Sequence, residues 1–141
     1  MKKIIVFSWI LVILLASGCG SRSGNNPKVS GQKNGTSEIN FREYQHDFGK
    51  VAEGEKLSYT FTFENKGTTD LIINSASTSC GCTVPKYDSK PIPSGGSGNL
   101  EVVFDTSGRN GTQTKVITVK SNAATQVVLL KITAEVVTND K

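Results

Sequence analysis

The sequence lacks the motifs on which most enzymes and nucleotide-binding proteins depend. It has one histidine and one methionine among its 141 residues. There is no Gly-x-Ser-x-Gly elbow and no Glu-rich pair that would support a hydrolase. No phosphate-binding loop, Rossmann fingerprint or calcium-binding loop is present either. These absences favour a protein that is not an enzyme.

The sequence also lacks a basic region in its main body. The formal net charge of the whole chain is +4, but residues 39–138 contain ten basic and ten acidic side chains, so their net charge is zero. The excess comes from the flanking segments, beginning with Lys2 and Lys3. A domain that binds nucleic acid needs a basic surface, so we expect no nucleic-acid partner.

Only one long apolar run is present, at residues 4–15, and it follows Met1-Lys2-Lys3. Twelve helical residues cover about 18 Å, which is well short of a hydrocarbon core of roughly 30 Å. A basic start followed by a run of this length is typical of a secretory signal rather than a membrane-spanning helix.

The segment that begins at the last residue of this run, Leu15-Ala16-Ser17-Gly18-Cys19, resembles the lipobox of bacterial lipoproteins. The resemblance implies that residues 1–18 are a cleaved signal peptide and that Cys19 is lipidated. Two acyl chains suffice for stable anchoring, so the membrane itself would be a partner. The alternative is an ordinary signal with an incidental cysteine.

Residues 20–38 are rich in Gly, Ser and Asn, and Val29 is their only large apolar residue. Such a segment cannot bury enough surface to fold, so we expect a flexible linker over residues 19–38 whose ends lie about 24 Å apart. In some bacterial lipoproteins an acidic cluster after the lipidated cysteine marks export to the cell surface, and no such cluster follows Cys19. We therefore favour the periplasmic face of the outer membrane over the cell surface.

Residues 39–138 show the period-two alternation of β-strands and no sustained helical period. The clearest alternation lies at residues 57–64, 100–105 and 127–136. Shorter strands are expected at residues 39–44, 47–51, 71–77 and 115–120. About seven strands separated by turn residues predict an all-β, Ig-like antiparallel sandwich, with residues 139–141 as a tail. Because the only tryptophan is Trp9, an antibody-type core is excluded.

Several motifs in this region occur in a specific order. They are His46-Asp47-Phe48-Gly49, Phe63-Glu64-Asn65-Lys66-Gly67, Leu71-Ile72-Ile73, Ser79-Cys80-Gly81-Cys82-Thr83-Val84-Pro85, Ile92-Pro93, Val102-Val103-Phe104-Asp105 and Ser121-Asn122. This pattern resembles the bacterial DUF1573 family, which is common among Bacteroidetes-type lipoproteins and related to the Ig-like domains of the ASH/HYDIN and major-sperm-protein group. The resemblance covers about residues 39–137 and implies a fold and a location, but no activity.

Cys80 and Cys82 are the residues best suited to chemistry. In an oxidising envelope a pair this close would tend to form a disulfide, which closes a very small ring, stabilises little and is easily reduced. Three interpretations stay open: a structural pair, a Cu(I) site and a redox-active dithiol. A zinc site within one chain would need carboxylates, because His46 is the only histidine.

The sequence therefore predicts a lipid-anchored envelope protein with a non-enzymatic Ig-like binding or scaffolding domain. We expect a protein partner in the envelope and no cofactor. The alternative is a copper-binding or thiol-redox protein that uses Cys80 and Cys82.

Overall fold

The computed structural model describes residues 35–138. The predicted signal peptide, Cys19, most of the linker and the tail therefore lie outside the described residues. Within them there is no helix long and apolar enough to span a membrane. The eight strands are β1 (Ile39–Phe41), β2 (Gln45–Ala52), β3 (Lys56–Asn65), β4 (Ile73–Thr78), β5 (Thr83–Tyr87), β6 (Ser97–Asp105), β7 (Gly111–Ser121) and β8 (Val127–Val137).

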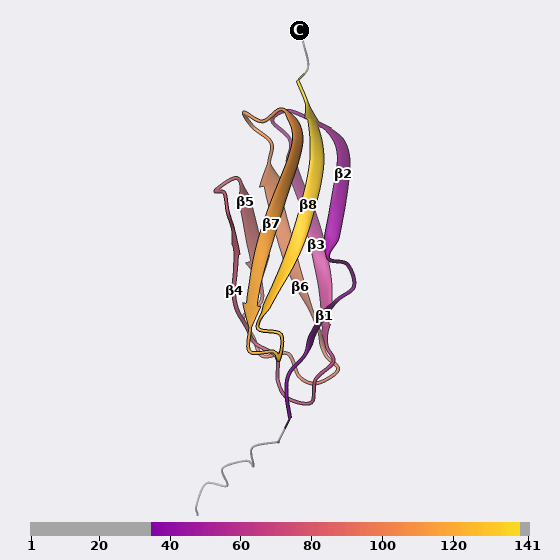
Figure 1. The fold of residues 1–141 in the computed structure, drawn as a ribbon, viewed down its shortest axis with the longest axis vertical. Coiled ribbons are helices and arrows are strands. Elements are labelled where there is room, and N and C mark those ends of the chain that lie inside the picture. Colours follow the sequence, from indigo (N-terminus) through magenta and orange to yellow (C-terminus); the bar gives the residue numbers. More distant parts are fainter. Residues whose placement is uncertain (1–34, 139–141) are drawn as a thin grey trace, which may run out of the picture. The chain divides into compact units, whose positions relative to one another are not determined.

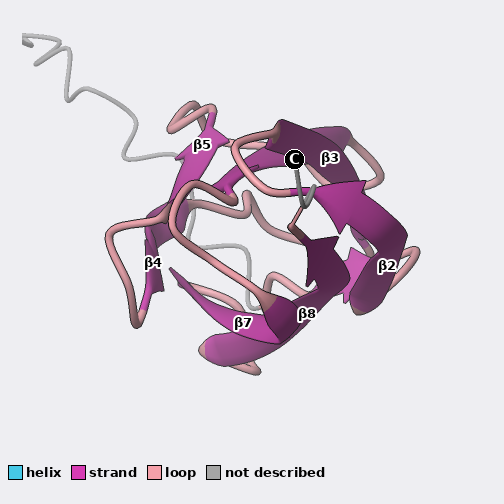
Figure 2. Cartoon of the chain, turned by 90° about the horizontal axis from the view of Figure 1, so that it is seen from above, coloured by secondary structure: helices cyan, strands magenta, loops and turns pink. Residues whose placement is uncertain are grey.

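The strands form two four-stranded sheets that face each other (Figures 1 and 2). One sheet has the order β1-β3-β6-β5 and the other has the order β2-β8-β7-β4. Every neighbouring pair is antiparallel except β2 and β8, which are parallel. The predicted all-β, Ig-like sandwich is confirmed, with eight strands where the sequence suggested about seven.

The core lies between the sheets and is built from the alternating residues that the sequence identified. Phe61 and Phe63 on β3 and Phe104 on β6 are each at most 1% exposed. Leu130 and Ile132 on β8 face them from the second sheet and are equally buried. Each large aliphatic or aromatic side chain contributes roughly 1.5–3 kcal/mol when it is fully buried. The domain therefore has an adequate apolar core of its own.

Two differences from the predicted strands have physical reasons. The expected strand at residues 39–44 is divided, because the chain leaves β3 after Arg42 and joins β8 from Tyr44 onward, where the Tyr44 carbonyl accepts the Lys131 N–H. The strand β5 was not predicted, because it is short and contains Pro85. A proline fits there because β5 is an edge strand that pairs only with β6.

Asn65 ties together three segments at one end of the sandwich, and its side chain is completely buried. Its amide nitrogen donates to the carbonyl oxygens of Thr69 at 2.8 Å and Ile92 at 2.9 Å. Its Oδ1 accepts the backbone N–H of Gly67 at 3.0 Å and that of Glu38 at 3.3 Å. The bond from Gly67 joins Asn65 to its own turn, and all four bonding positions of the amide are satisfied.

The substitution Asn65→Asp tests this network. It replaces the amide donors with an oxygen that faces two carbonyl oxygens in a buried site, so we expect a loss of about 3–5 kcal/mol in the free energy of unfolding. Urea denaturation measures the loss. As a control, Asn99→Asp makes the same change at an exposed position and should alter stability by less than about 0.5 kcal/mol. Equal midpoints for the two variants would contradict this role of Asn65.

Candidate functional site

The predicted cysteine pair lies where the chain crosses from one sheet to the other. Residues 79–82 connect β4, in the sheet β2-β8-β7-β4, to β5, in the sheet β1-β3-β6-β5. Cys80 and Cys82 are joined by a disulfide, and their Cα atoms are 5.4 Å apart. That separation is within the usual range for disulfides. The structure thus brings together the two residues that the sequence singled out.

Hydrogen bonds that do not involve the sulfur atoms hold this crossover. The Thr78 hydroxyl lies 2.8 Å from the carbonyl oxygen of Cys80 and 2.9 Å from that of Thr83. The backbone N–H of Asp105, at the end of β6, donates to the carbonyl oxygen of Cys82 at 2.9 Å. Both ends of the crossover are therefore fixed by the backbone and by Thr78, independently of the disulfide.

Asp105 is itself held in a turn at this end of the sandwich. The Ser107 hydroxyl and the Ser107 backbone N–H donate to its carboxylate and hold the pKa of Asp105 below its ordinary value, and Lys56 adds a smaller effect. The carboxylate therefore stays ionised at neutral pH. Its hydrogen bonds fix the residue whose backbone contacts Cys82.

Thr83 places a buried hydroxyl beside the disulfide. The residue is 3% exposed, and its Oγ1 lies 3.8 Å from the sulfur of Cys80 and 3.9 Å from that of Cys82. In the described part of the chain, these two sulfurs are the only hydrogen-bonding neighbours of this hydroxyl. The sequence analysis did not single out Thr83, because its orientation depends on its pairing with Phe104 of β6.

Gly81, between the two cysteines, faces open space. It is exposed, its φ lies outside the left-handed region, and a Cβ added to it would meet no atom within 4 Å. Neither backbone conformation nor packing requires glycine at this position. The exposed glycine thus lies between two half-buried cysteines at the surface of the crossover.

Among residues 35–138, no group of three or more His, Cys, Asp or Glu side chains is placed to hold a metal ion. A Cu(I) ion would have only the two cysteine sulfurs as ligands, and these would first have to be reduced. Copper binding therefore stays a prediction about the reduced chain.

His46 has a packing role and lies on β2. Its ring stacks on Tyr59 of β3, with a centroid distance of 3.5 Å and an interplanar angle of 10°. The Tyr59 hydroxyl donates to Glu43 at 2.7 Å, and this bond raises the pKa of the Tyr59 phenol. Among the described residues, His46 belongs to no cluster of side chains that could hold a metal ion.

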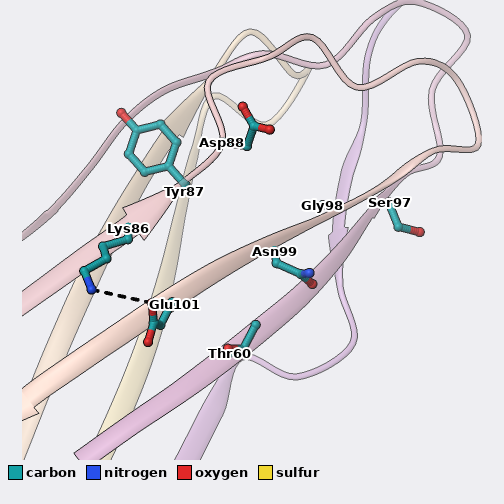
Figure 3. A pocket seen from close by; sticks show the side chains of 8 residues that line it. All are labelled: Thr60, Lys86, Tyr87, Asp88, Ser97, Gly98, Asn99 and Glu101. Carbon is teal, nitrogen blue, oxygen red and sulfur yellow. Dashed lines mark ion pairs between the residues drawn. The ribbon is translucent and has the colours of Figure 1, made fainter. Parts of the chain in front are cut away.

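A hollow of about 730 Å³ lies on the outer face of the sheet β1-β3-β6-β5 (Figure 3). It is lined by Thr60, Lys86, Tyr87, Asp88, Ser97, Gly98, Asn99 and Glu101. Lys86 and Glu101 form an ion pair of 3.7 Å across it, and both side chains are exposed. An exposed pair contributes little, and the Tyr87 ring packs against the core instead. With one basic residue (Lys86) against two acidic ones (Asp88 and Glu101), the hollow has a net charge of only −1, and no aliphatic side chain lines it, so little in it would select a ligand.

A second surface lies on the outer face of β7 and β8. Val116, Val127 and Leu129 are 39%, 48% and 59% exposed. Leu129 on β8 is paired with Thr118 on β7, and Val116 is two residues before Thr118 on the same face. Val127 is two residues before Leu129 and shares the face of β8 with it. We call these three residues the aliphatic patch. Alternation along β8 predicts that Val127 and Leu129 face outward, but their proximity to Val116 requires the strand register.

The comparisons with known proteins agree with this architecture. Residues 39–136 match a family described as a protein of unknown function, DUF1573. The chain belongs to the DUF1573 family. The sequence resemblance to this family is therefore confirmed over nearly all of the described residues. No curated protein matches the chain.

Solved structures show the same fold as the DUF1573 domain. A protein of unknown function from Porphyromonas gingivalis W83 matches with a TM-score of 0.61 and 22% identity, over 79% of this chain and 51% of that one. The chain thus spans about half the length of that protein. The ASH/PapD-like domain 7 of human CEP192 matches with a TM-score of 0.61 and 13% identity, over 74% and 89% of the two chains. The Vibrio cholerae protease VesB matches with a TM-score of 0.57 and 15% identity, over 71% and 32%. At these identities the likeness shows the fold alone, an Ig-like sandwich of the ASH/PapD type.

The crossover contacts predict that the DUF1573 domain folds without its disulfide. Replacing both Cys80 and Cys82 with Ser should lower the free energy of unfolding by at most about 2 kcal/mol, because a three-residue ring removes little chain entropy. Thermal unfolding of the double variant and the parent measures the difference. A double variant that is unfolded at 25 °C would show that the disulfide is essential to the fold.

Proposed function

We propose that this DUF1573 protein is a lipid-anchored, non-enzymatic binding module of the cell envelope, facing the periplasm. The observation that carries the proposal is the aliphatic patch on the outer face of β7 and β8. Leu129 at its centre is 59% exposed, although the sheet behind it has a complete core. Adjacent apolar side chains that remain exposed are a feature of interaction surfaces.

The charges around the patch indicate the chemistry of the partner. Lys120 is paired with Val127 across the two strands, and Lys131 is paired with Val116. In the described residues neither lysine takes part in an ion pair. The aliphatic patch therefore lies between two ammonium groups that have no partner there. We propose that the occupant is an envelope protein with an apolar centre flanked by carboxylates.

The anchor is supported by the sequence. The lipobox-like segment Leu15–Cys19 begins at the end of a twelve-residue apolar run that follows a basic start, and the linker separates Cys19 from the first strand. Two acyl chains on Cys19 would hold the protein at the membrane while the linker keeps the sandwich clear of the headgroups. The binding surface would then be available to partners in the same compartment.

The anchor predicts that Cys19→Ala prevents lipidation. Because the thioether needs the Cys19 sulfur, the variant should incorporate no labelled palmitate and should move from the membrane fraction to the soluble fraction. Labelling and fractionation of cells that make the full-length chain check this. The double replacement of Cys80 and Cys82 by Ser is the matched control and should remain lipidated. Labelling of Cys19→Ala equal to that of the parent would contradict the anchor.

The patch predicts that Leu129→Lys weakens partner binding. A third ammonium group at the centre of the patch removes the apolar contact, which is worth about 1.5–3 kcal/mol, or roughly ten- to a hundredfold in affinity. Cross-linking in membranes followed by recovery of the full-length chain measures partner yield.

The matched control is Val137→Lys. It makes a similar change on the same face of β8, about 27 Å from Leu129 at 3.4 Å per residue. Val137 is 39% exposed, so the fold should accept the lysine. Equal recovery of partners with the two variants would argue against the patch as the binding surface.

A further inference from the structure

We infer that the Cys80–Cys82 disulfide is a thiol–disulfide exchange site in the folded protein, and that Thr83 is the residue that assists exchange. This activity is separate from binding at the aliphatic patch. The substrate would be a dithiol, which donates two electrons to the disulfide.

The position of the Thr83 hydroxyl is the first support. A buried hydroxyl normally bonds to a nitrogen or oxygen atom, because burial without a partner is unfavourable. In the described residues this hydroxyl instead contacts only the two sulfurs, at 3.8 Å and 3.9 Å. A neutral disulfide sulfur is a weak acceptor, whereas a thiolate is a charged one. The contact therefore gains most in strength when the disulfide opens.

The Thr83 hydroxyl lies almost equally far from the sulfurs of Cys80 and Cys82. Whichever sulfur departs as a thiolate, the Thr83 hydroxyl is already beside it. The rate of exchange rises when the leaving thiolate is stabilised. Thr83 is thus placed to assist reduction regardless of which cysteine is attacked.

The disulfide is accessible, and the fold of the crossover does not depend on it; these two features are the second support. Cys80 and Cys82 are half-buried and not fully buried, and Gly81 between them is exposed and faces open space, so this part of the crossover is accessible to an attacking sulfur. The crossover is held by Thr78 and by the Asp105 N–H, so its backbone can stay in place after the disulfide opens. A disulfide needed only to hold the fold requires neither feature.

Exchange moves two electrons from the dithiol to the Cys80–Cys82 disulfide in two steps. One thiolate of the dithiol attacks Cys80 or Cys82, and a mixed disulfide forms. The electron pair of the original sulfur–sulfur bond leaves on the other cysteine, which accepts a proton from water. The second thiolate of the dithiol then attacks the dithiol's first sulfur, which is bonded to the cysteine in the mixed disulfide. This releases the cysteine as a thiolate, which is protonated in turn. The dithiol is oxidised to a disulfide and this protein is reduced by two electrons.

The test uses the full-length chain in detergent, with dithiothreitol as the dithiol. Free thiols are trapped with a maleimide and counted by intact mass, and circular dichroism monitors the fold. The parent should be reduced while it is folded. Thr83→Val keeps the size of the side chain but removes the hydroxyl. It should be reduced about tenfold more slowly, because a hydrogen bond to a charged group is worth at least this factor.

Two further variants separate the chemical role from a structural one. Thr83→Ser keeps the hydroxyl and should be reduced at nearly the rate of the parent. Thr62→Val removes a hydroxyl from a half-buried position on β3, away from the disulfide, and should also leave the rate unchanged. If the parent is reduced only after denaturation in urea, or if Thr83→Val is reduced as fast as the parent, the inference is wrong. Those outcomes leave the patch proposal untouched, because none of these residues belongs to the patch.

Discussion

The crossover from β4 to β5 is the constraint on which the site depends. At this point the backbone leaves one sheet and joins the other, so its polar groups lose the regular partners of a strand. New partners take their place: the Thr78 hydroxyl contacts the carbonyl oxygens of Cys80 and Thr83, and the Asp105 N–H donates to that of Cys82. The crossover is thereby fixed without its sulfur atoms. Two cysteines at the rim of the sandwich are then free to serve chemistry instead of stability.

The fold could be predicted where one face of a strand is consistently apolar. On β8, the polar residues Lys131, Thr133 and Glu135 fix the phase of the alternation at residues 127–136, and Leu130 and Ile132 on the opposite face are buried. Prediction was weaker at the sheet edges. Pro85 concealed β5, and the change of sheet between Phe41 and Gln45 divided what looks like one strand. Edge segments have fewer partners, so their sequences are less constrained.

The candidate site was predictable only in its local part. The spacing of Cys80 and Cys82 brings them together whatever the rest of the chain does. The Thr83 hydroxyl could not be assigned in this way, because its position comes from pairing with Phe104, twenty-one residues along the chain. The aliphatic patch needed the register of β7 against β8 for the same reason. Contacts between distant residues depend on tertiary structure, which a periodic pattern does not specify.

The two proposed sites, the aliphatic patch and the disulfide with Thr83, differ in which residues the fold would accept there. The aliphatic patch lies on outward positions of β7 and β8, where the core imposes no choice of residue, and polar side chains would leave the sandwich intact. At Thr83 the fold does impose a choice, because the position is buried, and a valine would fill it without burying a hydroxyl that has only weak sulfur acceptors. A threonine at that position, whose hydroxyl meets only sulfur in the described structure, is less favourable for folding than an apolar side chain of the same size. The hydroxyl is therefore better explained by the chemistry of the disulfide than by the stability of the sandwich.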